Sequence, residues 1–237
     1  MSMKKYTFIG GDLRNLKLAE SIHDDGNQVN IYGFSQSNFE TKLVENHNLK
    51  EAIDDSDIVI GPLPCSTDGE TFNAPFHSEK IHINEVFKIM KKNQLFIAGI
   101  LNDKILNLAK AYNVYAIDIY NREEIVVLNA IPTAEGAIQI AMEELPVTLN
   151  GSKVMVIGYG RVGKVLARML SALGADVYAV VRKYSDIAWI KAYGQKPVHF
   201  NEFKKYLGEM VVIFNTVPAK VLDSSALECV GRNCLII

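Results

Sequence analysis

The sequence is poor in the residues that build disulfide frameworks and metal sites. Its 237 residues include three cysteines and five histidines. Cys65, Cys229 and Cys234 form no C-x-x-C pair, and no cysteine–histidine spacing is typical of zinc. An odd number of scattered cysteines fits a reducing compartment better than a disulfide-stapled fold. We therefore expect a fold held by its own core, with no metal site.

Long apolar runs and a charge imbalance are also lacking. No uninterrupted apolar run approaches the roughly 18–20 residues of a membrane helix, and no secretory signal core follows the first lysines. The formal net charge of −2 gives no electrostatic basis for binding nucleic acid. With 49% hydrophobic and 22% charged residues, general disorder is excluded. We expect a soluble, cytoplasmic protein with no nucleic-acid or membrane partner.

What the sequence does contain is a glycine fingerprint in a well-defined setting. The apolar run 153–157 leads directly into Gly158-x-Gly160-x-x-Gly163, a helical pattern follows over 161–173, and a second apolar run covers 176–181. In such a strand–turn–helix–strand unit, the first glycine makes the turn, the second lets the backbone approach a pyrophosphate, and the third lets helix and strand pack closely. The helix N-terminus then binds the phosphates. A glycine-rich turn without a ligand is the less favoured alternative.

The residues after the second strand bear on the choice of nucleotide. Domains that bind NAD usually carry Asp or Glu there, to bond the ribose 2′-hydroxyl. This chain has Arg182 and Lys183 instead, with Ser185 as a further donor. Two cations suit a 2′-phosphate, so we predict NADP as the cofactor. The alternative is a pair of solvated cations.

Strand and helix patterns alternate along the whole chain, which is typical of parallel sheets with helices on both faces. We expect an α/β protein with two doubly wound domains: an N-terminal, flavodoxin-like substrate and dimerisation domain over 1–128, and a C-terminal Rossmann NAD(P)-binding domain over 151–237. A linking helix within 129–150 is expected to start at Pro132 or Thr133. Trp189 is expected in the core.

The last residues, 234–237, have the pattern of a fifth strand of the second domain. A standard dinucleotide domain continues with a further strand and helix at this point. We therefore expect the complete domain to extend beyond Ile237, in which case this stretch alone would be truncated.

Further candidate site residues follow the expected strands, because open α/β sheets bind ligands beyond the carboxyl ends of their strands. Arg14 follows the first strand and could clamp a carboxylate together with the Gly10 and Gly11 amides. Its alternative is a solvated cation on a helix face. Ser66 lies in a long polar loop, 65–79, that is either functional or merely a surface loop. Asn215 and Thr216 end the fourth strand of the second domain, where the nicotinamide is expected.

Taken together, these motifs resemble the family of dipicolinate synthase A subunits. The resemblance covers the whole chain and is most specific in the segment I-P-T-A-E-G-A, residues 131–137. It implies NADP-dependent oxidation of dihydrodipicolinate, a lysine-pathway intermediate, to dipicolinate in the mother cell during sporulation. It also implies work with the flavoprotein-like B subunit of dipicolinate synthase, and we expect a homo-oligomer. Family members continue past Ile237 with a glycine-rich segment and a helix.

The resemblance also implies roles for particular residues. Those expected to hold the cofactor are Gly158, Gly160, Arg161, Val162, Gly163, Arg182, Lys183, Ser185, Asn215, Thr216 and Val217. Those expected on the substrate side, as catalytic residues, are Arg14, Ser66, Thr133 and Glu135. Since ring aromatisation drives the loss of the proton, a weak base such as Glu135, or water, would suffice.

Two other readings stay open. One is a 2-hydroxyacid or amino-acid dehydrogenase, against which stands the lack of a His–carboxylate pair for carbonyl chemistry. The other is a non-catalytic NADP-binding subunit.

Overall fold

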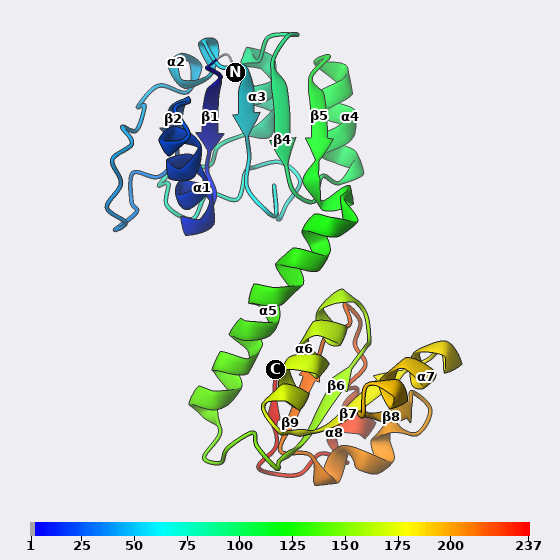
Figure 1. The fold of residues 1–237 in the computed structure, drawn as a ribbon. Helices are drawn as coiled ribbons and strands as arrows, with labels where there is room; N and C mark the ends of the chain where they lie inside the picture. The colour runs from blue at the N-terminus through cyan, green and yellow to red at the C-terminus, as the bar shows by residue number, and fades with distance from the viewer. Residues whose placement is uncertain (1–2) are drawn as a thin grey trace. The chain divides into compact units, whose positions relative to one another are not determined.

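The computed structural model describes residues 3–237, which form two compact units that divide between Arg122 and Glu123. Each unit is built on its own five-stranded parallel sheet (Figure 1). The division lies six residues before the boundary at residue 128 that was expected from the sequence.

The first unit is a doubly wound domain with strand order β2-β1-β3-β4-β5. This order is that of flavodoxin-like folds, so the expected fold is confirmed. Its strands are β1 (Lys5–Ile9), β2 (Gln28–Tyr32), β3 (Ile58–Ile60), β4 (Leu95–Ala98) and β5 (Tyr115–Asp118). Its α-helices are α1 (Leu13–Asp24), α2 (Leu49–Asp54), α3 (Ile83–Ile89) and α4 (Asp103–Ala111), and a 3₁₀ turn covers Ile119–Asn121.

The alternation of side chains along its strands creates two cores. Phe8 and Ile60 pack with α1 on one face of the sheet. Ile9 and Val59 pack with α2, α3 and α4 on the other face. Neighbours in a strand point to opposite faces, so apolar strands covered on both sides need continuous apolar runs rather than alternating ones.

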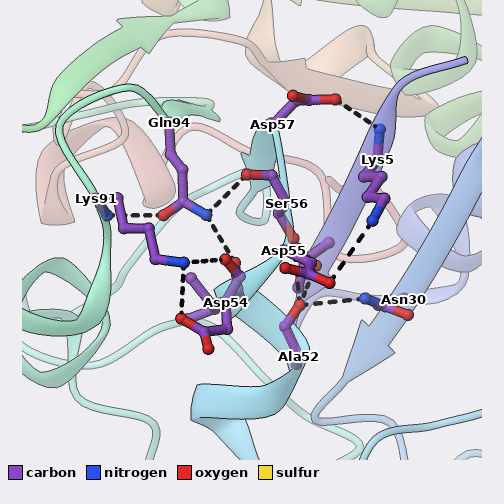
Figure 2. Close-up of polar contacts among 11 residues, drawn as sticks. Lys5, Asn30, Ala52, Asp54, Asp55, Ser56, Asp57, Lys91 and Gln94 are labelled. Carbon is purple, nitrogen blue, oxygen red and sulfur yellow. Dashed lines mark hydrogen bonds and ion pairs between the residues drawn. The ribbon is translucent and has the colours of Figure 1, made fainter.

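A buried polar network holds the amino ends of these strands together (Figure 2). Gln94, 2% exposed, donates through its side-chain nitrogen to the carbonyls of Ile53 and Ser56, both at 2.7 Å, and accepts from the Lys91 amide at 2.8 Å. The Thr7 hydroxyl bonds the Ala52 carbonyl and the Ser56 hydroxyl. These bonds join α2, β1 and the turn before β4. They fix the amino ends of the strands, whereas ligands in such folds bind at the carboxyl ends.

The second unit has strand order β10-β9-β6-β7-β8, which is the Rossmann arrangement expected from the sequence. Its strands are β6 (Lys153–Ile157), β7 (Asp176–Val181), β8 (Lys196–His199), β9 (Val212–Asn215) and β10 (Leu235–Ile236). Its helices are α5 (Glu123–Glu144), α6 (Arg161–Ala172), α7 (Tyr184–Ala192), the 3₁₀ helix Phe203–Glu209, and α8 (Ser224–Leu227), which was not foreseen. Val154 and Val156 pack under α5 and α6, while Met155 and Ile157 face the opposite core.

Helix α5 differs from its expected form. It starts at Glu123, not at Pro132 or Thr133, and Pro132 lies inside it. Pro132 has no N–H and therefore cannot make the helical hydrogen bond to the Leu128 carbonyl. At the next position, the Thr133 hydroxyl donates to the Asn129 carbonyl at 2.8 Å. Ala134 and Ile138 pack into the core of the second unit, which holds the helix in place. By length and hydropathy alone, α5 would also pass for a membrane span, a property that core helices share.

Trp189 corrects another expectation. It lies on α7 with 58% of its surface exposed and stacks on Tyr193, with ring centroids 5.8 Å apart. Trp189 therefore lies on the surface of α7 and not in the core. As the only tryptophan of the chain, it can report on this helix by its fluorescence.

We expect Gln94→Ala to lower the free energy of unfolding of the first unit by about 1–3 kcal/mol, because it leaves buried backbone groups without their partner. Urea titration followed by circular dichroism would measure the loss. Gln139→Ala removes an exposed glutamine of α5 that bonds only Glu143 among the described contacts, and it serves as the control. Equal stability of the two variants would contradict the assigned role of the network.

Candidate dinucleotide site

The turn after β6 has a backbone that only glycine adopts easily. Gly158 has φ +97°, in the left-handed region, and its amide donates to the Val180 carbonyl at 3.0 Å. A Cβ atom on Gly158 would lie 2.7 Å from Val217 Cγ1 and 2.8 Å from Thr216 Oγ1. The turn is therefore pressed against the loop that follows β9.

The other two glycines of the fingerprint stand in opposite surroundings. A Cβ on Gly163 would lie 2.3 Å from the Gly158 carbonyl oxygen, so this glycine is required by the protein's own packing. A Cβ on Gly160 would meet nothing within 4 Å. Gly160 is also the N-cap of α6, and no side chain caps the helix there. The result is an open space in front of amides that have no partner within the helix.

A cleft of about 410 Å³ opens beside this turn, at the carboxyl ends of β6 and β7. Its lining includes Gly158, Gly160, Arg182, Lys183, Phe200 and Pro218. The amides and positive end of α6, together with two cations, suit a phosphorylated ligand. The residues present thus fit a dinucleotide, as the sequence predicts.

Arg182 is held in the cleft by an aromatic ring. Its guanidinium carbon lies 4.9 Å from the centroid of Phe200. Within residues 3–237, no carboxylate forms an ion pair with Arg182. Asp186, which the sequence analysis did not single out, also lines the cleft, whereas Ser185 is exposed and does not. A cation fixed by its face on a ring keeps its N–H edge available to a phosphate.

Arg161 points elsewhere than expected. Its side chain makes three hydrogen bonds to Glu123 at the start of α5, at 2.6–3.0 Å. These bonds hold the pKa of Glu123 below its usual value. The guanidinium of Arg161 therefore joins α6 to α5.

A second cleft, of about 370 Å³, brings predicted residues together from α5 and from the loop after β9. Thr133, Val162, Asn215, Thr216 and Val217 all line it. Val217 also lines the first cleft, as does Pro218, so the two are neighbours along this loop. The Thr216 hydroxyl donates to the Ile157 carbonyl at 2.9 Å, which ties the loop to the end of β6. Glu135 is exposed and lies outside this lining.

The candidates of the first unit are engaged by the protein itself. Arg14 forms a forked pair with Asp12, at 2.7–3.0 Å, and donates to the Leu63 carbonyl at 3.0 Å. Burial alone would raise the pKa of Asp12, but the hydrogen bonds from Arg14 lower it. The Gly10 amide donates to the Tyr32 carbonyl and the Gly11 amide to the Asn73 carbonyl. Both amides are thus already bonded within the protein. The expectation that they clamp a carboxylate together with Arg14 is therefore wrong for the amides.

Ser66 belongs to a turn organised by Asp68, a residue that the sequence analysis missed. The Ser66 hydroxyl donates to Asp68 at 3.0 Å and accepts from the Gly69 amide at 2.8 Å. Asp68 also accepts from the Thr71 and Glu70 amides, and these bonds lower the pKa of its carboxyl group. Asp at the first position of a polar turn is a known signal, which could have identified it.

Comparisons with known proteins agree with this geometry. Residues 5–120 match the model of the N-terminal domain of the dipicolinate synthase A subunit, and residues 132–226 match that of the NAD binding domain of D-isomer specific 2-hydroxyacid dehydrogenases. The dipicolinate synthase A subunit of Bacillus subtilis (strain 168) is 27% identical over 242 residues, covering 98% of this chain and 79% of that protein.

Two solved structures are similar over nearly the whole chain. The crystal structure of the dipicolinate synthase A subunit from Bacillus halodurans has a TM-score of 0.86 at 26% identity and covers 99% of this chain and 81% of its own. That of the A chain from Bacillus subtilis has a TM-score of 0.82 at 28% identity, with 100% and 80% covered.

The two later glycines of the fingerprint should respond differently to alanine. We expect Gly163→Ala to destabilise the second unit by about 2–3 kcal/mol, because its Cβ would overlap the Gly158 carbonyl. Gly160→Ala has room and should cost less than about 1 kcal/mol, the size of an N-cap effect. Thermal unfolding followed by Trp189 fluorescence compares them. A larger loss of stability in Gly160→Ala than in Gly163→Ala would contradict the open space that the structure shows in front of α6.

Proposed function

Since the chain is a homologue of the dipicolinate synthase A subunit in both of its units, we propose that it oxidises dihydrodipicolinate to dipicolinate with NADP as the acceptor. The observation that carries the proposal is the open, uncapped N-terminus of α6 beside Arg182. A dehydrogenase-like dinucleotide domain supports an oxidoreductase. The choice of NADP, the substrate and the partner below are parts of this proposal.

The chain's own groups would bind the cofactor in two places. The amides that open α6 take the pyrophosphate, and Gly160 leaves room for it. Arg182 and Lys183, at the carboxyl end of β7, take the 2′-phosphate of NADP. When bound, the nicotinamide ring supplies the hydride-accepting carbon. The cleft between Thr133 and Asn215 is the part of this unit that we assign to that ring.

The reaction asks little acid–base chemistry of the protein. Oxidation of dihydrodipicolinate removes a hydride and a proton, and the product ring becomes aromatic. Bound NADP would supply the hydride acceptor, so the protein would have to provide only a path for the proton. Thr133 lines the cleft, whereas Glu135, two residues further on α5, lies outside its lining, because residues two apart do not share a helix face. We therefore assign the proton to water in the cleft ahead of Glu135. Thr133 would position the substrate.

The first unit would bind the substrate's carboxylates. Arg14 is its exposed cation at the carboxyl end of β1, held by Asp12 against the Leu63 carbonyl. A dicarboxylate would have to share this guanidinium with Asp12. Ser66, in the turn after β3, would offer its hydroxyl only by giving up its bond to Asp68.

The remaining parts of the proposal rest on the relatives. The name of the Bacillus protein describes one subunit of an enzyme, so we propose the B subunit of dipicolinate synthase as a partner and, in addition, a homo-oligomer. We place the activity in the cytoplasm of the mother cell of a sporulating bacterium.

A 2-hydroxyacid or amino-acid dehydrogenase is the second candidate, favoured by the match of residues 132–226. Against it, neither cleft of the second unit is lined by a histidine among the residues that the structure describes. Carbonyl reduction needs an acid of suitable pKa near the substrate. A non-catalytic NADP-binding subunit is the third.

Arg182→Ala should raise the dissociation constant of NADPH by about 10- to 100-fold, the range of a lost charge-assisted hydrogen bond, and leave NADH nearly unchanged. Fluorescence titration with both nucleotides measures this. Arg232→Ala removes an exposed arginine of the same unit outside both clefts and is the control. Tighter binding of NADH than of NADPH by the unaltered protein would overturn the choice of NADP.

Substrate assays separate the three functions. With the B subunit, dihydrodipicolinate and NADP present, we expect NADPH and dipicolinate to form together. Gly160→Ala should slow the formation of both, because it weakens the binding of the cofactor. Turnover of 2-hydroxyacids or amino acids instead would favour the second candidate. Tight NADPH binding without any turnover would favour the third.

A further inference from the structure

A third cavity of the second unit lies beside α6 and shares Tyr159 with the lining of the dinucleotide cleft. Its volume is about 540 Å³, within the usual range for small-molecule sites. Its lining residues come from the glycine turn, from α6 and from the segment between α7 and β8: Tyr159, Lys164, Val165, Arg168, Ser171, Tyr193 and Gln195. We call it the α6–α7 pocket. None of the functions proposed above uses it.

Two cations stand side by side on its helical wall. Lys164 and Arg168 are four residues apart on α6, so they are neighbours on one face of the helix. Over residues 3–237, neither has a carboxylate within ion-pairing distance. Like charges four residues apart on a helix repel each other. An anion between them would relieve that repulsion.

The floor of the pocket is fixed by a chain of buried hydrogen bonds. The Tyr159 hydroxyl donates to the side-chain oxygen of Gln195 at 3.3 Å, and the Gln195 nitrogen donates to the Ser171 hydroxyl at 3.1 Å. Ser171 in turn donates to the Ala167 carbonyl at 2.9 Å. Tyr159 is 8% and Gln195 7% exposed. A glutamine buried and satisfied in this way holds the pocket's shape before any ligand arrives.

The opposite wall is aromatic. Tyr193 lines the pocket, is 63% exposed and stacks on Trp189. Lys164 Nζ lies 5.8 Å from the centroid of Tyr159, which places positive charge over a ring. Exposed stacked rings offer a flat apolar face to a planar ligand. The pocket thus combines a cationic wall with a face for stacking.

From this combination we infer that the α6–α7 pocket binds a small aromatic carboxylate. Arg168 and Lys164 take the carboxylate, with the fork of the arginine matching its two oxygens. The ring of the ligand lies against Tyr193. An inorganic anion would use only the cations, and an uncharged ring only the tyrosine. The inference does not depend on the proposed function, because Lys164, Arg168 and Tyr193 are assigned to neither the cofactor nor the substrate. Tyr159 is the residue that this pocket shares with the dinucleotide cleft.

Trp189 makes the inference testable in the intact chain, because it stacks on Tyr193 and is the only tryptophan. Isophthalate is the probe, cyclohexane-1,3-dicarboxylate has the same two carboxylates without the aromatic ring, and inorganic phosphate has charge alone. We expect saturable quenching of Trp189 by isophthalate, at least about tenfold weaker binding of the other two, and weaker isophthalate binding at high salt.

Variants locate the binding. Arg168→Ala should weaken the binding of isophthalate at least about tenfold, which is the loss expected for a charge-assisted hydrogen bond. Arg232→Ala, outside all three clefts, and Arg182→Ala, in the dinucleotide cleft, should leave it unchanged. Calorimetry of the same titrations confirms that the fluorescence change reports binding.

Three results would overturn the inference. Equal binding of phosphate and isophthalate would reduce the pocket to a patch of charge. Loss of binding in Arg182→Ala but not in Arg168→Ala would place the ligand in the dinucleotide cleft. If isophthalate produced neither heat nor quenching at any concentration, the pocket would not bind small aromatic carboxylates. Because NADPH binding is measured separately, failure here and failure of the proposed function are distinguishable.

Discussion

The contact on which the second unit depends is the approach of Gly163 to the carbonyl oxygen of Gly158. A Cβ at Gly163 would come within 2.3 Å of that oxygen, so any side chain would push α6 away from β6. The close approach brings the start of the helix directly over the end of the strand. It also directs the amides of the first turn, which have no partner within the helix, toward the space at Gly160. The positions of the dinucleotide cleft and of the loop after β9 both depend on this close approach of α6 to β6.

Much of the fold follows from local pattern. Apolar runs of strand length between helical patterns predict parallel sheets, and both strand orders are the ones expected. The start of α5 does not follow, because Pro132 and Thr133 have the local signature of a helix N-terminus. Their neighbours Ala134 and Ile138 are buried against the second unit, and this packing carries the helix through the proline. Such tertiary support is invisible in a window of sequence.

The candidate site shows the same limit at the scale of side chains. Arg182 lines the cleft because its place, one residue after β7, is set by the strand itself. Arg161 and Arg14 are as well placed in the chain, yet each forms a fork with a carboxylate of its own unit, Glu123 and Asp12. The backbone position of a cation could thus be predicted. Whether its charge is left for a ligand depends on rotamers and partners that only the folded chain brings together.

The two glycine turns also differ in how the helix that follows each of them is capped. In both units the first strand is followed directly by a glycine turn and a helix. The Gly10 and Gly158 amides both donate to a carbonyl of a neighbouring strand, but in the first unit the Asp12 carboxylate also caps α1. That negative charge already compensates the helix dipole and would repel a phosphate. In the second unit, Gly160 offers no side chain to α6, and the compensation is left to a ligand. The chemistry of the cap, more than the number of glycines, therefore decides which turn of an α/β sheet is an anion site.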